Sequence, residues 1–116
     1  MAVRERQKMP RTARRYDVYL PITFNDGRPI PRELFDRVER RLLARFVGLT
    51  AQQQAFPFRG MWSGGRQLYI EEVIVIASLD YRRRGSARFI TQLKQDLLRE
   101  FDQLEILITE APLRVH

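Results

Sequence analysis

The feature that most constrains this fold is a run of five apolar residues, Val73-Ile74-Val75-Ile76-Ala77, inside the segment 66–79. Because β-branched residues dominate the run, it is typical of a β-strand that is buried on both faces, and we expect it in the middle of a sheet. Gly64 and Gly65 precede the segment and supply the backbone freedom that a reversal needs. The segment therefore predicts a hairpin in which this strand pairs with the residues that end at Trp62.

Other segments carry regular hydrophobic patterns. Apolar residues alternate with polar ones over 16–24 and again over 104–109, which predicts two further strands. Helical spacing of apolar residues predicts one helix over 31–46 and a second from Ser86, a candidate N-cap, to Phe101. With a short, bulged edge strand before the glycine turn, the order is strand, helix, strand, strand, helix, strand. This order predicts an α+β fold of the ferredoxin-like βαββαβ type, a four-stranded antiparallel sheet with two helices on one face and the first and third strands in the middle.

The composition limits the chemistry that the chain can perform. A length of 116 residues with 44% hydrophobic residues predicts a single domain with one core. The sequence has no cysteine and one histidine, the last residue, so we expect neither a metal site nor histidine-based catalysis. No phosphate-binding loop or dinucleotide fingerprint is present, and we expect no cofactor. The sequence also lacks a secretory signal and a membrane-spanning apolar run, which favours a cytoplasmic protein with no membrane partner.

Positive charge is concentrated at the N-terminus. Of the 21 basic residues that give the net charge of +7, six fall in the first 16 positions. We therefore predict a basic, flexible arm over 1–15, followed by a single domain over 16–116. A second cluster lies before the second helix, where three consecutive arginines could hold phosphates. The alternative is a general preference for arginine, because 19 of the 21 basic residues are arginine. The residues predicted as possible nucleic-acid contacts are Arg11, Arg14, Arg15, Arg82, Arg83 and Arg84.

Four short motifs distinguish the domain: Gly48-Leu49-Thr50 after the first helix, Gly60-Met61-Trp62, the Gly64-Gly65 turn, and Glu71 or Glu72 before the apolar run. On these motifs, residues 16–116 resemble uncharacterised small bacterial proteins with a ferredoxin-like fold, grouped under a domain of unknown function. The resemblance implies a fold and no reaction. The first strand departs from the expected family pattern, because Tyr19-Leu20-Pro21 stands where an aromatic residue followed by glycine is expected.

Two adjacent carboxylates, Glu71 and Glu72, fall inside the predicted central strand, and one of them must face each side of the sheet. A buried carboxylate would have a raised pKa and could act as an acid or a base. Alternatively, this end of the strand is exposed to water, or Arg59 or Arg66 pairs with the inward carboxylate. Nearby aromatic residues could stack a ligand or could pack in a core or an interface. The predicted ligand pocket consists of Trp62, Tyr69, Glu71 and Glu72.

These observations lead to one main prediction of function and two alternatives. Because both helices are expected on one side of the sheet, its other side lacks a cover, and an uncovered apolar sheet face is typical of an interface. No catalytic residue is identified. The main prediction is a non-enzymatic interaction or binding module that self-associates through this open face, most simply as a homodimer about a two-fold axis. The alternatives are a nucleic-acid-binding protein that uses the arginine-rich arm and loop, and a small-molecule-binding or cofactor-free enzyme of dimeric α+β type.

Overall fold

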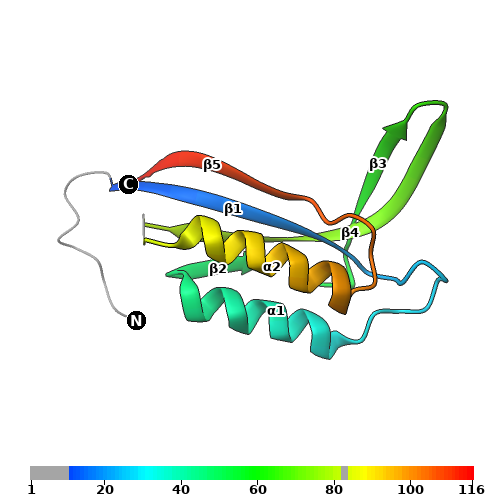
Figure 1. Cartoon of the computed structure of the whole chain (residues 1–116), viewed down its shortest axis with the longest axis horizontal. Helices are drawn as coiled ribbons and strands as arrows, with labels where there is room; N and C mark the ends of the chain where they lie inside the picture. The colour runs from blue at the N-terminus through cyan, green and yellow to red at the C-terminus, as the bar shows by residue number, and fades with distance from the viewer. Residues whose placement is uncertain (1–10, 82–83) are drawn as a thin grey trace.

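The structure is a computed structural model that describes residues 11–81 and 84–116. Figure 1 shows an antiparallel sheet with two helices across it, which confirms the predicted α+β class. The strand order is β2-β4-β1-β5, with β3 also pairing with β4, so β1 and β4 lie in the middle as predicted. The prediction of four strands is wrong, because the described chain contains five. In chain order the elements are β1 (Arg11–Pro21), α1 (Arg32–Arg45), β2 (Gly48–Ala51), β3 (Phe58–Gly64), β4 (Gln67–Asp80), α2 (Ser86–Glu100) and β5 (Ile108–Val115).

The extra strand arises because β4 is long enough to pair with two separate segments. β2 pairs with residues 76–79 of β4, and β3 pairs with residues 67–73. Between them, the main chain of Gln52 donates to the Val75 carbonyl, and the Gln52 side-chain oxygen accepts from the Val75 N–H. The Gln52 side chain thus continues the ladder by one bond after the β2 backbone leaves it. Pro57, which has no N–H to donate, then precedes β3.

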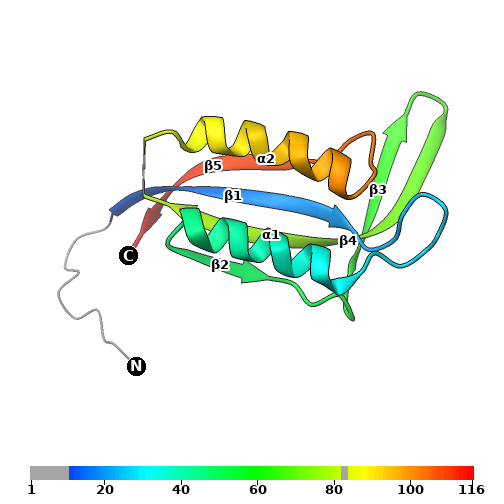
Figure 2. The ribbon, with the colours of Figure 1, turned by 60° about the horizontal axis from the view of Figure 1, so that its bottom comes forward.

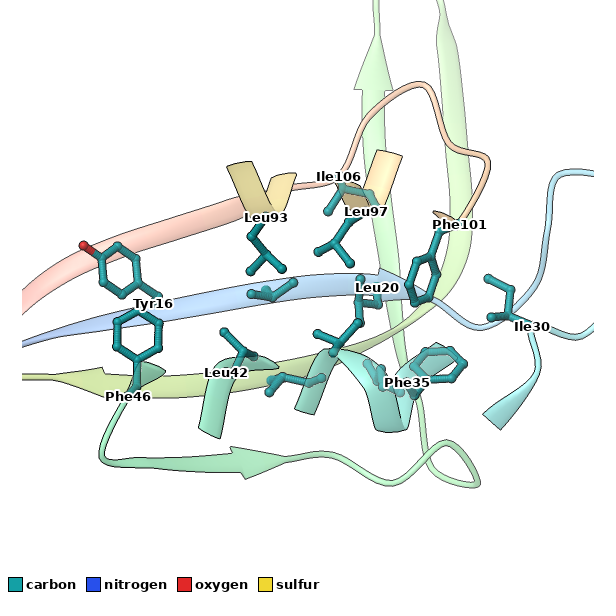
Figure 3. Close-up of a cluster of buried hydrophobic side chains, with 14 residues drawn as sticks. Tyr16, Leu20, Ile30, Phe35, Leu42, Phe46, Leu93, Leu97, Phe101 and Ile106 are labelled. Carbon is teal, nitrogen blue, oxygen red and sulfur yellow. The ribbon is translucent and has the colours of Figure 1, made fainter. Parts of the chain in front are cut away.

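Both helices pack on the same face of the sheet, and the core lies between the two layers (Figures 1 and 2). Alternate residues of β1 and β4 point into this core, and the two helices contribute the apolar stripes that their spacing predicts. Figure 3 shows the aromatic contacts at its two ends, where Tyr16 stacks on Phe46 and Phe35 meets Phe101 edge-on. The most deeply buried core side chains include Val18, Leu20, Leu42, Ile74, Ile76, Leu93, Leu97 and Phe101.

The predicted glycine turn and hairpin are confirmed, but the hairpin does not lie in the middle of the sheet. β3 and the first half of β4 leave the body of the molecule and project from one end of it (Figures 1 and 2). The turn is a two-residue loop in which Gly65 has φ +65°, as a type II′ turn requires at its first position. Within β4, only residues from Val73 onward carry buried side chains. The apolar side chains exposed on the hairpin are Phe58, Met61, Trp62, Leu68, Tyr69 and Ile70.

Several predicted boundaries differ from the structure. β1 begins at Arg11, so residues 11–15 belong to the sheet and not to the predicted arm, while residues 1–10 lie outside the described part. The last strand spans Ile108–Val115 and includes Pro112, which an edge strand accommodates because one side of it has no partner. Gly85, with φ +89°, occupies the N-cap position of α2, and Ser86 is the first helical residue. Neither described helix is long and apolar enough to cross a membrane.

Candidate functional site

The predicted ligand-binding residues lie on two different faces of the projecting hairpin. In the antiparallel register Trp62 lies opposite Tyr69, and Gly60 lies opposite Glu71, so Trp62, Tyr69 and Glu71 share one face of the hairpin. Glu72 lies opposite Arg59 and points to the other face. The structure therefore brings three of the four predicted residues together and separates the fourth. Both carboxylates lie on exposed residues, as the alternative of a water-exposed strand end predicted.

A hydrogen bond fixes the centre of this face. Trp62 Nε1 donates to Glu71 Oε1 at 2.8 Å, across the two strands. A Cβ added at Gly60 would lie 3.1 Å from Trp62 Nε1, which places the indole directly over the bare backbone of that glycine. Gly64 is covered in the same way, because its Cβ would lie 3.0 Å from Cε2 of Tyr69. The Trp62 and Tyr69 rings therefore pack directly on the backbone of Gly60 and Gly64, and the Glu71 carboxylate lies beside the indole.

The rings on this face remain accessible to a ligand. The exposed fraction is 40% for Trp62 and 54% for Tyr69. The Tyr69 hydroxyl donates to the side-chain oxygen of Gln67, which lies on the same face. The face thus offers two aromatic rings and a carboxylate that is already oriented by a hydrogen bond. Such a surface suits a flat heterocycle or an organic cation.

The same face continues onto the open side of the sheet. Phe58 lies opposite Val73 at the base of the hairpin and also lines a hollow of about 410 Å³ on the helix-free face. β1 contributes the polar wall of this hollow, where Arg15 Nε donates to Asp17 Oδ1 at 2.8 Å. This hydrogen bond to Asp17 raises the pKa of the Arg15 guanidinium. The residues that line the hollow are Arg15, Asp17, Tyr19, Thr50, Ala51, Gln52, Phe58, Val75 and Ala77.

The polar residues of this hollow were not among the predicted site residues. The apolar alternation over 16–24 predicted a strand, and no functional role was assigned to the polar residues between the apolar ones. Because Tyr16, Val18 and Leu20 point into the core, Asp17 and Tyr19 must point to the open side. The open face is therefore more polar than predicted, and the exposed apolar surface lies mainly on the hairpin.

Of the residues predicted to contact nucleic acid, the four that the structure describes lie towards the opposite end of the sheet from the hairpin. Arg11, Arg14 and Arg15 belong to β1, and Arg84 precedes α2. Arg11 and Arg15 lie on the open face, whereas Arg14 lies on the helix side and pairs with Glu110 at 2.5 Å. Arg82 and Arg83 lie outside the described residues. Within the described ranges, no group of three or more acidic or histidine residues could hold a metal ion.

A comparison of structures shows that an enzyme has a fold similar to that of this chain. No protein-family model matches the sequence, and no curated protein matches it either. Among solved structures, the chain is similar to a phage SAM lyase in complex with S-methyl-5'-thioadenosine, with a TM-score of 0.62 and 14% sequence identity. The match covers 98% of this chain and 95% of the lyase chain. At this identity the likeness shows a shared fold, and the resemblance to uncharacterised bacterial proteins stays a prediction.

This finding contradicts the main prediction of function. A non-enzymatic interaction module was predicted from the partly apolar, uncovered sheet face and from the lack of familiar catalytic motifs. The fold that matches nearly the whole chain is nevertheless the fold of an enzyme. The absence of familiar motifs is therefore a poor guide here, because a site can consist of ordinary carboxylates and aromatic rings that the fold brings together.

Proposed function

We propose that the chain is an enzyme that cleaves S-adenosylmethionine and releases S-methyl-5'-thioadenosine. The observation that carries this proposal is the structural match with a phage SAM lyase bound to that nucleoside, which extends over almost the full length of both chains. Since a fold can support many activities, the proposal needs a site whose chemistry suits the substrate. The hairpin face that carries Trp62, Tyr69 and Glu71 is the candidate.

The substrate presents two groups that this face can recognise. Its adenine is a flat heterocycle, which stacks on aromatic rings. Its sulfonium centre is a cation without hydrogen-bond donors, so aromatic faces and a nearby carboxylate are the groups that can stabilise it. The exposed rings of Trp62 and Tyr69 lie beside Glu71, whose carboxylate already accepts from Trp62 Nε1. We assign these three residues to substrate binding, with Glu71 near the sulfonium.

The reaction breaks the bond between the sulfonium sulfur and the γ-carbon of the methionine chain. The electron pair of that bond goes to sulfur, which becomes the neutral thioether of S-methyl-5'-thioadenosine. A lyase needs no water for this step, since the substrate's own carboxylate can attack the γ-carbon and close a lactone. Because positive charge on sulfur disappears in the transition state, Glu71 stabilises the substrate at least as well as the transition state. Its role is therefore to bind and orient the substrate.

Matched substitutions of two adjacent carboxylates test this assignment. Glu71→Gln removes a charged contact to the substrate, which lowers kcat/KM by about ten- to a hundred-fold, mostly through KM. Glu72→Gln makes the same change in charge one residue away on the opposite face, and activity stays within about two-fold. Chromatography of the nucleoside product measures both. The proposal fails if purified wild-type protein releases no S-methyl-5'-thioadenosine, and the site assignment fails if the two variants behave alike.

We also propose that a second copy of the chain covers the open face. The candidate surface is not enclosed within one chain, since the hairpin rings and carboxylate are exposed and the adjoining hollow opens on the uncovered side of the sheet. A binding site that must exclude water requires a cover, and apolar residues exposed on a projecting hairpin are typical of an interface. Two copies related by a two-fold axis would provide the simplest arrangement. Sedimentation would also detect larger ring-shaped oligomers.

Sedimentation at tens of micromolar tests this association. Ala77 lies on the open face and is partly buried, so Ala77→Glu places a charge in the proposed interface and shifts the protein towards a monomer. The matched control is Leu43→Glu on the exposed side of α1, where 54% of the residue is accessible. A wild-type protein that remains a monomer at these concentrations contradicts the proposal. If the monomeric protein still releases S-methyl-5'-thioadenosine, the proposed association is wrong and the proposed enzymatic activity stands.

The strand order further supports a ferredoxin-like classification. We propose that the fold is a ferredoxin-like variant whose second strand is divided into β2 and β3. The order, with β1 and β4 in the middle and β5 at one edge, is the one that this topology requires, and both helices lie on one face. An experimental structure in which β2 and β3 pair with different strands would contradict this classification.

A further inference from the structure

The arginines of this protein are unevenly placed with respect to its acidic residues. One end of the molecule, where β1 begins, β5 ends and α2 begins, carries arginines from all three elements (Figure 1). Elsewhere the charges are mixed, since Arg59 lies opposite Glu72 on the hairpin and Arg32 pairs with Asp36 at the start of α1. A general preference for arginine over lysine explains the residue type but not the excess of positive charge at one end.

Four arginines at this end define what we call the arginine patch: Arg11, Arg84, Arg88 and Arg114. All four are exposed, and none forms an ion pair with another described residue. The Arg11 guanidinium lies over the Tyr81 ring, 3.9 Å from its centroid, in a cation–π contact.

Acidic groups at the same end do not cancel the charge of the patch. Glu110 is paired with Arg14, and Asp17 is paired with Arg15. Asp80 is 2% exposed, so its carboxylate contributes little to the accessible surface. The accessible charge that remains is therefore positive.

We propose that the arginine patch binds nucleic acid through its phosphate backbone, independently of the proposed substrate site on the hairpin at the other end of the molecule (Figure 1). Phosphodiesters carry a regular row of negative charges, and arginine binds phosphate oxygens with two parallel hydrogen bonds. The planar guanidinium of Arg11, stacked on the Tyr81 ring, adds a flat surface on which an unpaired base can lie. Contacts with phosphates carry no information about base sequence, so we expect binding that is independent of sequence.

The salt dependence of binding gives a quantitative expectation. Contacts of four arginines with phosphates give a slope of about −3 for log K against log salt on single strands, and about −4 on duplexes. Between 50 and 200 mM salt, affinity for a single strand therefore falls by about fifty-fold. Fluorescence anisotropy with labelled 20-nucleotide DNA and RNA, each single- and double-stranded, measures these slopes with the full chain and shows which form is preferred.

Two variants of equal net charge identify the surface. R11Q/R84Q/R88Q/R114Q removes the patch, and we expect its slope to approach zero with a loss of affinity of at least ten-fold. R28Q/R32Q/R37Q/R99Q removes four exposed or half-exposed arginines from other parts of the surface and keeps most of the slope. Equal losses in the two variants overturn the proposal, since net charge alone would then explain binding. Equally tight, patch-dependent binding to anionic lipid vesicles would overturn nucleic acid as the partner.

Discussion

At the scale of single residues, one backbone position carries strain that a substitution can relieve. Asp102, just after α2, has φ +50°, in the left-handed region that glycine adopts freely. Its main chain continues the helix end through a bond from Asp102 N–H to the Arg99 carbonyl. We expect Asp102→Gly to raise the free energy of unfolding by about 1 kcal/mol. Urea denaturation measures the change. Gln103→Gly, where φ is not positive, lowers stability or leaves it unchanged.

A second prediction at this scale concerns the geometry of the indole on the hairpin. Trp62 is the sole tryptophan of the chain, so its emission reports this site alone. Gly60→Ala places a methyl group 3.1 Å from Trp62 Nε1, which forces the ring to move and weakens its hydrogen bond to Glu71. We expect the emission maximum and its quenching by acrylamide to change. Gly48→Ala adds a methyl group with no atom within 4 Å and leaves the spectrum as it is. An unchanged spectrum in Gly60→Ala would contradict the described ring position.

At the scale of secondary-structure elements, ion pairs join the two helices. Asp96 of α2 accepts from Gln92, from Arg41 of α1 and from Arg99, and these bonds lower the pKa of its carboxyl group. A carboxyl whose pKa is lower in the folded state adds stability above its unfolded pKa of about 3.9, and this stability is lost as the pH falls through the folded value. We therefore expect the melting temperature to fall below about pH 5, and to fall less steeply in Asp96→Asn. Asp102→Asn, which alters an exposed carboxylate, should retain the wild-type slope.

The elements also show how far the sequence predicts this fold. Long periodic segments, such as the helices and the central part of β1, follow from their apolar spacing because the core selects one face of each. β2 is four residues long, too short for a pattern to be visible. The apolar residues of the hairpin have the same composition as a core strand, and their exposure depends on how far β4 extends beyond the helices. β5 was placed too early because Ile106 is buried although it lies outside any strand.

Only the hairpin part of the candidate site was predictable, because a single short turn determines which of its residues face each other. The Gly64-Gly65 turn was visible in the sequence, and its register brings Trp62 to Glu71, nine positions along the chain. The contribution of β1 to the hollow depends on pairing between β1 and β4, which are separated by some fifty residues. No local pattern specifies that pairing. The sequence therefore indicated the hairpin part of the site and missed the part on the sheet.

At the scale of the whole molecule, β4 belongs to two regions of different stability. Its second half lies between β1 and β2 and contributes Ile74 and Ile76 to the core. Its first half has β3 as its partner and carries no buried side chain before Val73. Regions with few buried contacts open locally at a lower free energy than the core. The amides of this one continuous strand should therefore show two levels of protection from hydrogen exchange.

Hydrogen exchange measured residue by residue tests this division. We expect the amides of residues 58–71 to exchange through local opening, at least a hundred-fold faster than those of residues 74–79, which exchange on global unfolding. Gly65→Pro, which gives the turn a ring that cannot adopt φ +65°, should speed exchange in the hairpin and leave the melting temperature nearly unchanged. If a second copy covers the hairpin, protection of residues 58–71 rises with protein concentration while residues 74–79 stay constant. Equal protection along β4 in a dilute, monomeric sample would contradict the two-region description.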